Sequence, residues 1–135
     1  SPENGRAMAP GGGELSLSSH AVSRGGSYSA ASRRDDGPGY ALRYDGDALH
    51  IVGLEDQSEA LSVKWLHVSG IWARVQFHKA HGFSLEVTFE TSTSGSPCDF
   101  FRVSAAMDAT GGEFLGYLQS AQAGRLKEGA PPRFA

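Results

Sequence analysis

Cysteine is nearly absent from this chain, since Cys98 is the only one among 135 residues. A single thiol can neither close an intramolecular disulfide nor form a zinc cluster of several cysteines. The sequence also lacks an apolar run long enough to cross a bilayer, so we expect no membrane insertion. Stability must then come from an ordinary hydrophobic core, and the length is enough for one domain.

A surplus of positive charge is also missing. The chain carries 12 basic and 15 acidic residues, which gives a formal net charge of −3. Proteins that bind nucleic acid normally present a basic face, and anionic membrane surfaces attract basic segments. We therefore expect no nucleic acid among the partners and no attachment to an anionic membrane.

Signatures of catalysis are missing as well. There is no G-x-S-x-G turn, and Cys98 follows a proline without a neighbouring base. The glycine-rich stretches at 11–13 and 111–112 lack the lysine and the strand-to-helix context of a phosphate-binding loop. Glu86 and Glu90 share one side of an expected strand and fit a solvated face better than an acid/base pair. The sequence favours a non-catalytic protein, with a small hydrolase kept as an alternative.

Glycine, in contrast, is abundant, with 18 residues. Much of it lies in residues 1–39, which are rich in Gly and Ser and poor in large apolar side chains. Such a segment buries too little surface to offset its ordering entropy, so we expect a flexible arm. Its alternating piece at 14–18 could add an edge strand, and 28–33 could do the same.

From residue 40 onward, apolar and polar side chains alternate in short runs separated by Gly, Asp and Ser. About seven strands at spacings near ten residues are the pattern of an antiparallel β-sandwich. We predict an all-β sandwich domain over 40–120 and a C-terminal tail over 121–135 that frays. A helix has room only within 120–128. The expected strands are 40–44, 47–52, 61–68, 71–78, 83–91, 100–106 and 114–119.

The acidic residues cluster at expected turns, where Asp caps backbone amides. Asp99 and Asp108 are the two of interest, and Asp108 is the candidate metal ligand. A calcium site needs several converging oxygen ligands, and the sequence shows no such cluster, so no cofactor is predicted. His78 and His81 lie three apart, but strand periodicity sends them to opposite sides, which argues against zinc.

Aromatic residues are the better lead to a function. Trp72 alternates with Ile71 and Ala73, so it belongs to the face opposite the expected core. The same face carries three planar polar side chains. The four candidate ligand-binding residues of this strand are Trp72, Arg74, Gln76 and His78. An aromatic ring beside planar polar groups suits sugar binding, because stacking supplies area and the polar groups fix hydroxyls. The alternative is that both faces are partly buried, with Trp72 packed under a loop.

Residues 69–119 resemble the concanavalin-type jelly roll. The likeness to L-type lectins rests on Gly46-Asp47-Ala48, on the F-S-x4-F ladder from Phe83 to Phe89, and on Phe114-Leu115-Gly116. Laminin-G modules are similar in the same stretch, through Phe114 to Leu118 and Gly124-Arg125-Leu126. This resemblance covers about the last two-thirds of the chain.

The resemblance implies carbohydrate binding, an extracellular or secreted location, and contact of Asp99 with sugar. Phe100 stands where those lectins usually have Gly. The sole asparagine is Asn4, so the lectin family's sugar- and calcium-binding Asn has no counterpart.

Two other families share shorter patterns. The pattern Trp65-x4-Gly70-x-Trp72-x4-Phe77-His78 looks like a strand pair of nuclear-transport-factor-2-like domains, which would imply an association or oligomerisation module. Residues 68–75 are similar to a motif of PilZ cyclic-dinucleotide receptors, without its Asp and without a preceding R-x-x-x-R. Our leading interpretation is a non-catalytic module that binds carbohydrate or a protein ligand through a sheet face and adjacent loops.

Overall fold

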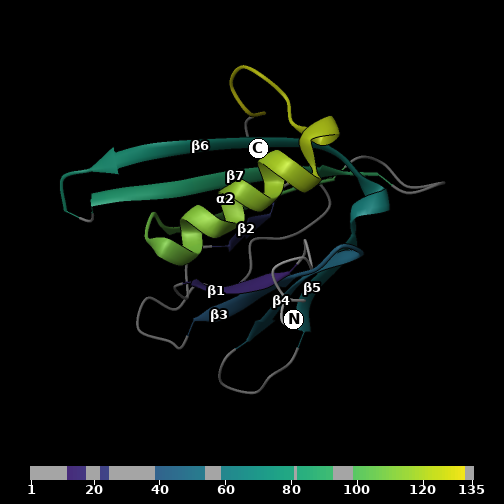
Figure 1. Ribbon diagram of the computed structural model, residues 1–135, viewed down its shortest axis with the longest axis horizontal. Helices are drawn as coiled ribbons and strands as arrows, with labels where there is room; N and C mark the ends of the chain where they lie inside the picture. Colours follow the sequence, from purple (N-terminus) through teal and green to yellow (C-terminus); the bar gives the residue numbers. More distant parts are fainter. Residues whose placement is uncertain are drawn as a thin grey trace, which may run out of the picture.

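The computed structural model describes residues 12–17, 22–24, 39–53, 59–80, 82–92 and 99–132. Within these ranges the chain forms eight strands in two four-stranded sheets, in which all pairs are antiparallel (Figure 1). One sheet has the order β1 (Gly13–Leu17), β3 (Tyr40–Tyr44), β4 (Ala48–Gly53), β5 (Glu59–Lys64). The other has the order β2 (Val22–Arg24), β8 (Asp99–Ala106), β7 (Gly82–Thr91), β6 (Val68–His78). The predicted all-β sandwich is thereby confirmed.

Local alternation and turn chemistry explain the first hairpin. In β3 and β4 the side chains that face the core are apolar, and Asp45 begins the turn between the strands. Its carboxylate accepts hydrogen bonds from the amides of Asp47 and Ala48, at 2.8 and 2.9 Å. An Asp side chain that caps its own turn fixes the register of the two strands.

The amino-terminal edge strand expected at 14–18 is present as β1, which pairs with β3. β2 was not expected, and it pairs with β8 of the other sheet. The second possible edge strand at 28–33, the rest of the expected flexible arm, His81 and Cys98 lie outside the described residues.

The strand expected over 61–68 is shorter than predicted. β5 ends at Lys64, and a 3-10 turn, η1 (Trp65–His67), turns Trp65 into the core. β6 then starts at Val68, and its register with β7 shifts between Val68 and Gly70. Residues 69–70, predicted as a turn, are therefore an irregularity inside a longer strand.

The strand predicted over 114–119 is wrong, and so is the expectation that a helix has room only within 120–128. Residues Ala109–Ala121 form the helix α2, which begins at its N-cap Asp108. Helical spacing places Phe114, Tyr117 and Leu118 on one face, and all three are buried. Three glycines in a short apolar segment hid this periodicity in the sequence.

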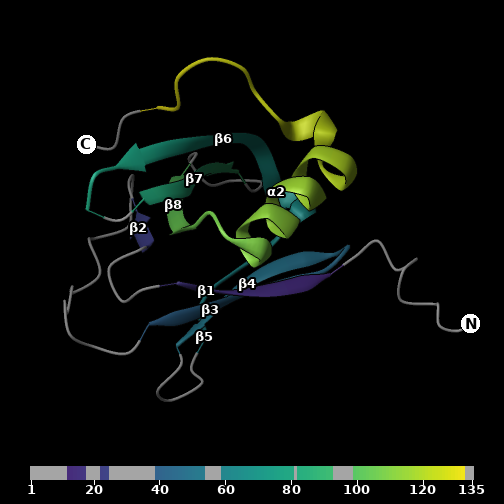
Figure 2. The ribbon, with the colours of Figure 1, turned by 60° about the vertical axis from the view of Figure 1, so that its left-hand side comes forward.

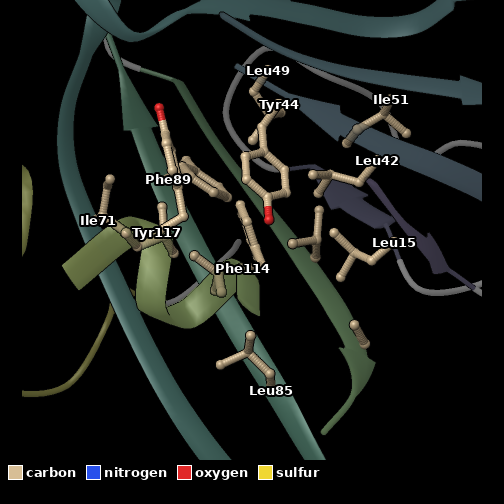
Figure 3. Packing of buried hydrophobic residues seen from close by; sticks show 14 of the residues in the cluster. Leu15, Leu42, Tyr44, Leu49, Ile51, Ile71, Leu85, Phe89, Phe114 and Tyr117 are labelled. Atoms are coloured by element: carbon tan, nitrogen blue, oxygen red, sulfur yellow. The ribbon is translucent and has the colours of Figure 1, made fainter. Parts of the chain in front are cut away.

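Helix α2 fills the opening between the two sheets, which diverge at that side of the molecule (Figure 2). The ring of Tyr44 from β3 lies 4.8 Å, centroid to centroid, from those of Phe114 and Tyr117 (Figure 3). On the other side of the core, the rings of Phe89 and Phe101 stack at 4.7 Å. Apolar side chains from both sheets and the helix thus form one continuous core.

The described part of the chain after α2 is bonded to β6, although the sequence predicted a tail that frays. A 3-10 turn, η2 (Ala123–Arg125), leads to Leu126, which forms a parallel bridge with Ile71 of β6. The amide of Lys127 donates to the carbonyl of Ile71 at 2.8 Å. Residues 126–132, here called the C-terminal segment, then form an exposed loop over 127–130 (Figure 2) and return to the sheet that contains β6 at Pro132.

Candidate binding face

The sheet β2-β8-β7-β6 has one side in the core and one side turned away from it, here called the outer face. Core-facing residues such as Ile71, Val87 and Val103 are buried, so strand alternation sends their neighbours to the other side. The described residues of the outer face are Trp72, Arg74, Gln76 and His78 on β6, Ser84, Glu86, Thr88 and Glu90 on β7, and Phe100, Arg102 and Ser104 on β8.

Trp72 is half-buried, and its indole lies against the backbone of Gly70. A methyl group at Gly70 would lie 3.1 Å from two carbons of the indole six-membered ring and 3.2 Å from the carboxylate of Glu90. The absence of a side chain at residue 70 therefore provides the space that the ring occupies. The indole is packed on the sheet without being sealed in the core.

Beside the indole, charged and planar groups hold one another in place. Arg74 Nε donates to Glu86 Oε1 at 2.8 Å, and Arg102 Nε lies 3.9 Å from the same oxygen. With its amide oriented to satisfy both partners, the Gln76 side-chain oxygen accepts from Arg74 Nε and Nη2 at 3.0 and 2.9 Å. Arg102 Nε also donates to Thr88 Oγ1 at 3.0 Å. These side chains form a connected row across β6, β7 and β8, and such mutual bonding reduces their freedom before any ligand binds.

Thr88 lies in the middle of this row and is fully buried, at 0% exposure, although it faces away from the core. The guanidinium of Arg102, which bonds to Thr88, also donates from Nη2 to the carbonyl of Pro132 at 3.2 Å. The C-terminal segment is thus attached to this sheet at two points, at the β6 edge through Lys127 and on the outer face through Pro132 and the long side chain of Arg102.

The structure brings four of the five predicted ligand-binding residues together. Trp72, Arg74, Gln76 and His78 share the outer face along β6. Asp99 does not join them. It is the first residue of β8 and pairs with Thr91, and strand alternation places both on the same side of the sheet as the core residues Phe89 and Phe101. A ligand on the outer face would therefore lie on the opposite side of the sheet from Asp99.

Asp108, the candidate metal ligand, is the N-cap of α2. Its Oδ1 accepts from the amides of Thr110 and Gly111, both at 3.0 Å, and from Thr110 Oγ1 at 2.8 Å. Hydrogen bonds from the Gly111 amide and the Thr110 hydroxyl lower the pKa of the Asp108 carboxyl. A pocket of about 350 Å³ adjoins it, and Glu14 on its wall bonds to Arg43. No group of three or more His, Cys, Asp or Glu side chains suited to a metal occurs in the described part of the chain.

Glu86 and Arg102 lie on the outer face but are not among the residues that the sequence predicts for ligand binding. The sequence favours a solvated face for Glu86, and Arg102 lies inside an apolar run. The alternation of Phe101 and Val103 around Arg102 is the signal that places the arginine opposite the core. That Arg102 and Glu86 meet depends on the register of β7 with β8, which alternation does not give.

Neither a protein-family model nor a curated protein sequence matches this chain. Among the helices that the structure describes, none is long and apolar enough to span a membrane.

Proposed function

We propose that this protein is a non-catalytic binding module that holds carbohydrate on its outer face. The proposal rests chiefly on one observation: the half-buried indole of Trp72 lies beside a row of planar hydrogen-bonding groups that already hold one another in position. Stacking of a sugar ring on an indole removes apolar surface from water, and preorganised polar groups can bond hydroxyls at low entropic cost.

The pairing of Arg74 with Glu86 also fits binding better than catalysis. An ion pair at 2.8 Å holds Arg74 Nε and Glu86 Oε1 together, with Arg102 as a second cation near the same carboxylate, and other donor and acceptor positions of these groups remain. Such an arrangement offers fixed donors and acceptors to hydroxyl groups. Asp99 and Asp108 lie elsewhere and are not included in this proposal.

A panel of immobilised glycans, probed with the purified protein, tests the proposal. We expect binding to a subset of glycans, and a loss of roughly tenfold or more in affinity for Trp72→Ala, because the stacking surface is removed. Gly70→Ala should also weaken binding, since the new methyl group would displace the indole.

The matched control is Phe83→Ala, which removes an exposed aromatic ring from the core-facing side of β7. This variant should bind glycans as the parent protein does. Absence of binding to any glycan, or an equal loss in the Trp72→Ala and Phe83→Ala variants, would contradict a carbohydrate site on the outer face.

A further inference from the structure

The far end of the β6–β7 hairpin carries exposed apolar side chains on the side where the core would be expected. Along β6 this side changes from Ile71, which is buried, to Val75 and Phe77, which are 46% and 61% exposed. On β7 the neighbouring Phe83 is 59% exposed, and its ring lies 5.1 Å from that of Phe77. The hairpin projects beyond the opposite sheet, so nothing described covers these side chains (Figure 1). We call Val75, Phe77 and Phe83 the apolar hairpin surface.

β6 is also the last strand of its sheet in the described part of the chain. The carbonyl of Ile71 points away from β7, because it accepts the bond from the Lys127 amide. In an antiparallel strand, backbone groups alternate in direction, so Ala73, Val75 and Phe77 direct their N–H and C=O groups to the same open side. The C-terminal segment occupies this edge only at Ile71.

An open edge next to exposed apolar side chains is a template for pairing with another strand. We propose that a second copy of this chain binds here, with the two β6 strands antiparallel and the two-fold axis at Val75. The sheets of the two copies would then be continuous, and the two apolar hairpin surfaces would form one patch. The pairing uses the backbone edge of β6 and the apolar hairpin surface on the core-facing side, so the inference does not depend on the carbohydrate proposal.

The sequence of β6 is self-complementary in this register. Val75 pairs with itself, and Ala73 pairs with Phe77, so each apolar side chain meets an apolar partner. On the other side of the strand Arg74 lies opposite Gln76, so no like charges are directly opposed, as they would be if Arg74 paired with itself. An isologous interface requires this kind of self-matching.

A lipid surface fits the same residues less well. A bilayer could take up Phe77 and Phe83, but it offers no hydrogen-bond partners to the open backbone groups of Ala73 and Val75. A second β6 strand satisfies both the side chains and the backbone.

Sedimentation equilibrium or light scattering across a concentration series tests the proposal. We expect the mass to rise from one chain, 14.2 kDa, to twice that value. Val75→Lys should raise the dimer dissociation constant roughly tenfold or more, because it places two like charges on the two-fold axis. The matched control is Leu66→Lys, which adds the same charge at a residue that is 73% exposed outside this surface and should leave the constant unchanged.

A disulfide test reports on the register. In the Cys98→Ser background, Val75→Cys should form an intermolecular disulfide under mild oxidation. Directly opposed residues have Cα atoms about 5.5 Å apart, which is within the range for a disulfide. Leu66→Cys in the same background should cross-link only at the rate of random collision.

Three outcomes would overturn the proposal. The first is a single-chain mass at all concentrations up to about 1 mM. The second is a dimer that responds equally to Val75→Lys and Leu66→Lys, or that cross-links as fast through residue 66 as through residue 75. The third is a chain that remains monomeric but binds phosphatidylcholine or phosphatidylserine vesicles in a way that Phe77→Ser abolishes, which would assign the surface to lipid.

Discussion

At the scale of single residues, Asp45 accepts hydrogen bonds from four residues, two in its own turn and two in η1 and α2. The sequence alone indicates only its role in the turn. Its main-chain carbonyl accepts from Trp65 Nε1 and from the Tyr117 hydroxyl, both at 2.8 Å. Its carboxylate accepts hydrogen bonds from the backbone amides of Asp47 and Ala48 within the turn. The turn residue thus fixes the β3–β4 hairpin and presents one carbonyl to both η1 and α2, which explains how a surface turn helps to position the core.

The Asp45 carboxylate should make stability depend on pH in the acid range. Backbone hydrogen bonds, first from Asp47 and then from Ala48, lower its pKa from the ordinary 3.8. A lowered folded-state pKa means that the contribution is fully present above about pH 3.8 and is lost as the pH falls through the folded value. Asp45→Asn keeps an acceptor but removes the titration, so it should be less stable than the parent at neutral pH. The difference should narrow on acidification below pH 3.8.

Urea denaturation of both proteins at a series of pH values measures this difference. A free-energy difference that stays constant between neutral and acid pH would show that Asp45 contributes through geometry alone. Asp108, whose pKa is also lowered, remains in both proteins and cancels from the comparison.

Alternation in the sequence predicted correctly that Trp72, Arg74, Gln76 and His78 share a face, because the period of two fixes the side of each residue. It could not predict that Val75 and Phe77 are exposed. Exposure depends on where the opposite sheet ends, which is a property of the tertiary structure and not of β6.

At the scale of elements, local signals predicted the hairpins well. The β3–β4 and β6–β7 pairs join strands that are close in sequence, so turn residues and alternation suffice to find them. Helix α2 was missed because its first turns contain Gly111 and Gly112, which resemble a loop. The capping residue Asp108, followed by apolar residues at helical spacing, was the signal that could have revealed it.

Substitution by alanine should lower the stability of the protein at Gly111 and raise it at Gly116, although both glycines lie in α2. A Cβ at Gly111 would clash with the carbonyl oxygen of Ala106, so Gly111→Ala must push α2 away from β8. We expect a loss of about 1–3 kcal/mol in the free energy of unfolding, as for other overpacked sites. A Cβ at Gly116 meets nothing within 4 Å, and Gly116→Ala should gain about 0.5–1 kcal/mol from helix propensity.

Thermal and urea unfolding of the two variants provide the measurement. Because both changes replace glycine by alanine in the same helix, they match in chemistry and differ in surroundings. Equal effects of the same sign would mean that the close contact between α2 and β8 does not exist in solution.

At the scale of the whole molecule, α2 fills the opening between the two sheets, and the C-terminal segment is attached to the outer face at Arg102 (Figure 2). The place of α2 between the sheets and the path of the C-terminal segment could not be predicted from local pattern. The helix fits there because the two sheets diverge. The segment is held by Lys127 at the β6 edge and by Pro132 at Arg102, contacts between residues far apart in the sequence. The resemblance to concanavalin-type jelly rolls remains a prediction.

The C-terminal segment should control access to the centre of the outer face. A chain that ends at Gly129 retains the bridge at Leu126 but loses Pro132 as an acceptor for Arg102. Arg102 would then no longer be held over Thr88 by Pro132, so we expect Thr88 to become more exposed. Introduced cysteines can report this in the Cys98→Ser background, where Thr88→Cys should react slowly with a thiol reagent in the full-length chain. In the truncated chain it should react roughly tenfold faster or more, because Arg102 is no longer fixed beside residue 88 by its bond to Pro132.

Val87→Cys is the matched control, because Val87 is the next residue of β7 and is buried on the core side. It should stay protected in both chains, so that faster labelling of residue 88 alone means local uncovering and not unfolding. Equal labelling of Thr88→Cys in the full-length and truncated chains would show that Trp72 and Arg102 bury Thr88 without the segment. If the segment does cover the outer face, the truncated chain should also bind glycans more tightly, because the ligand no longer competes with Pro132 for Arg102.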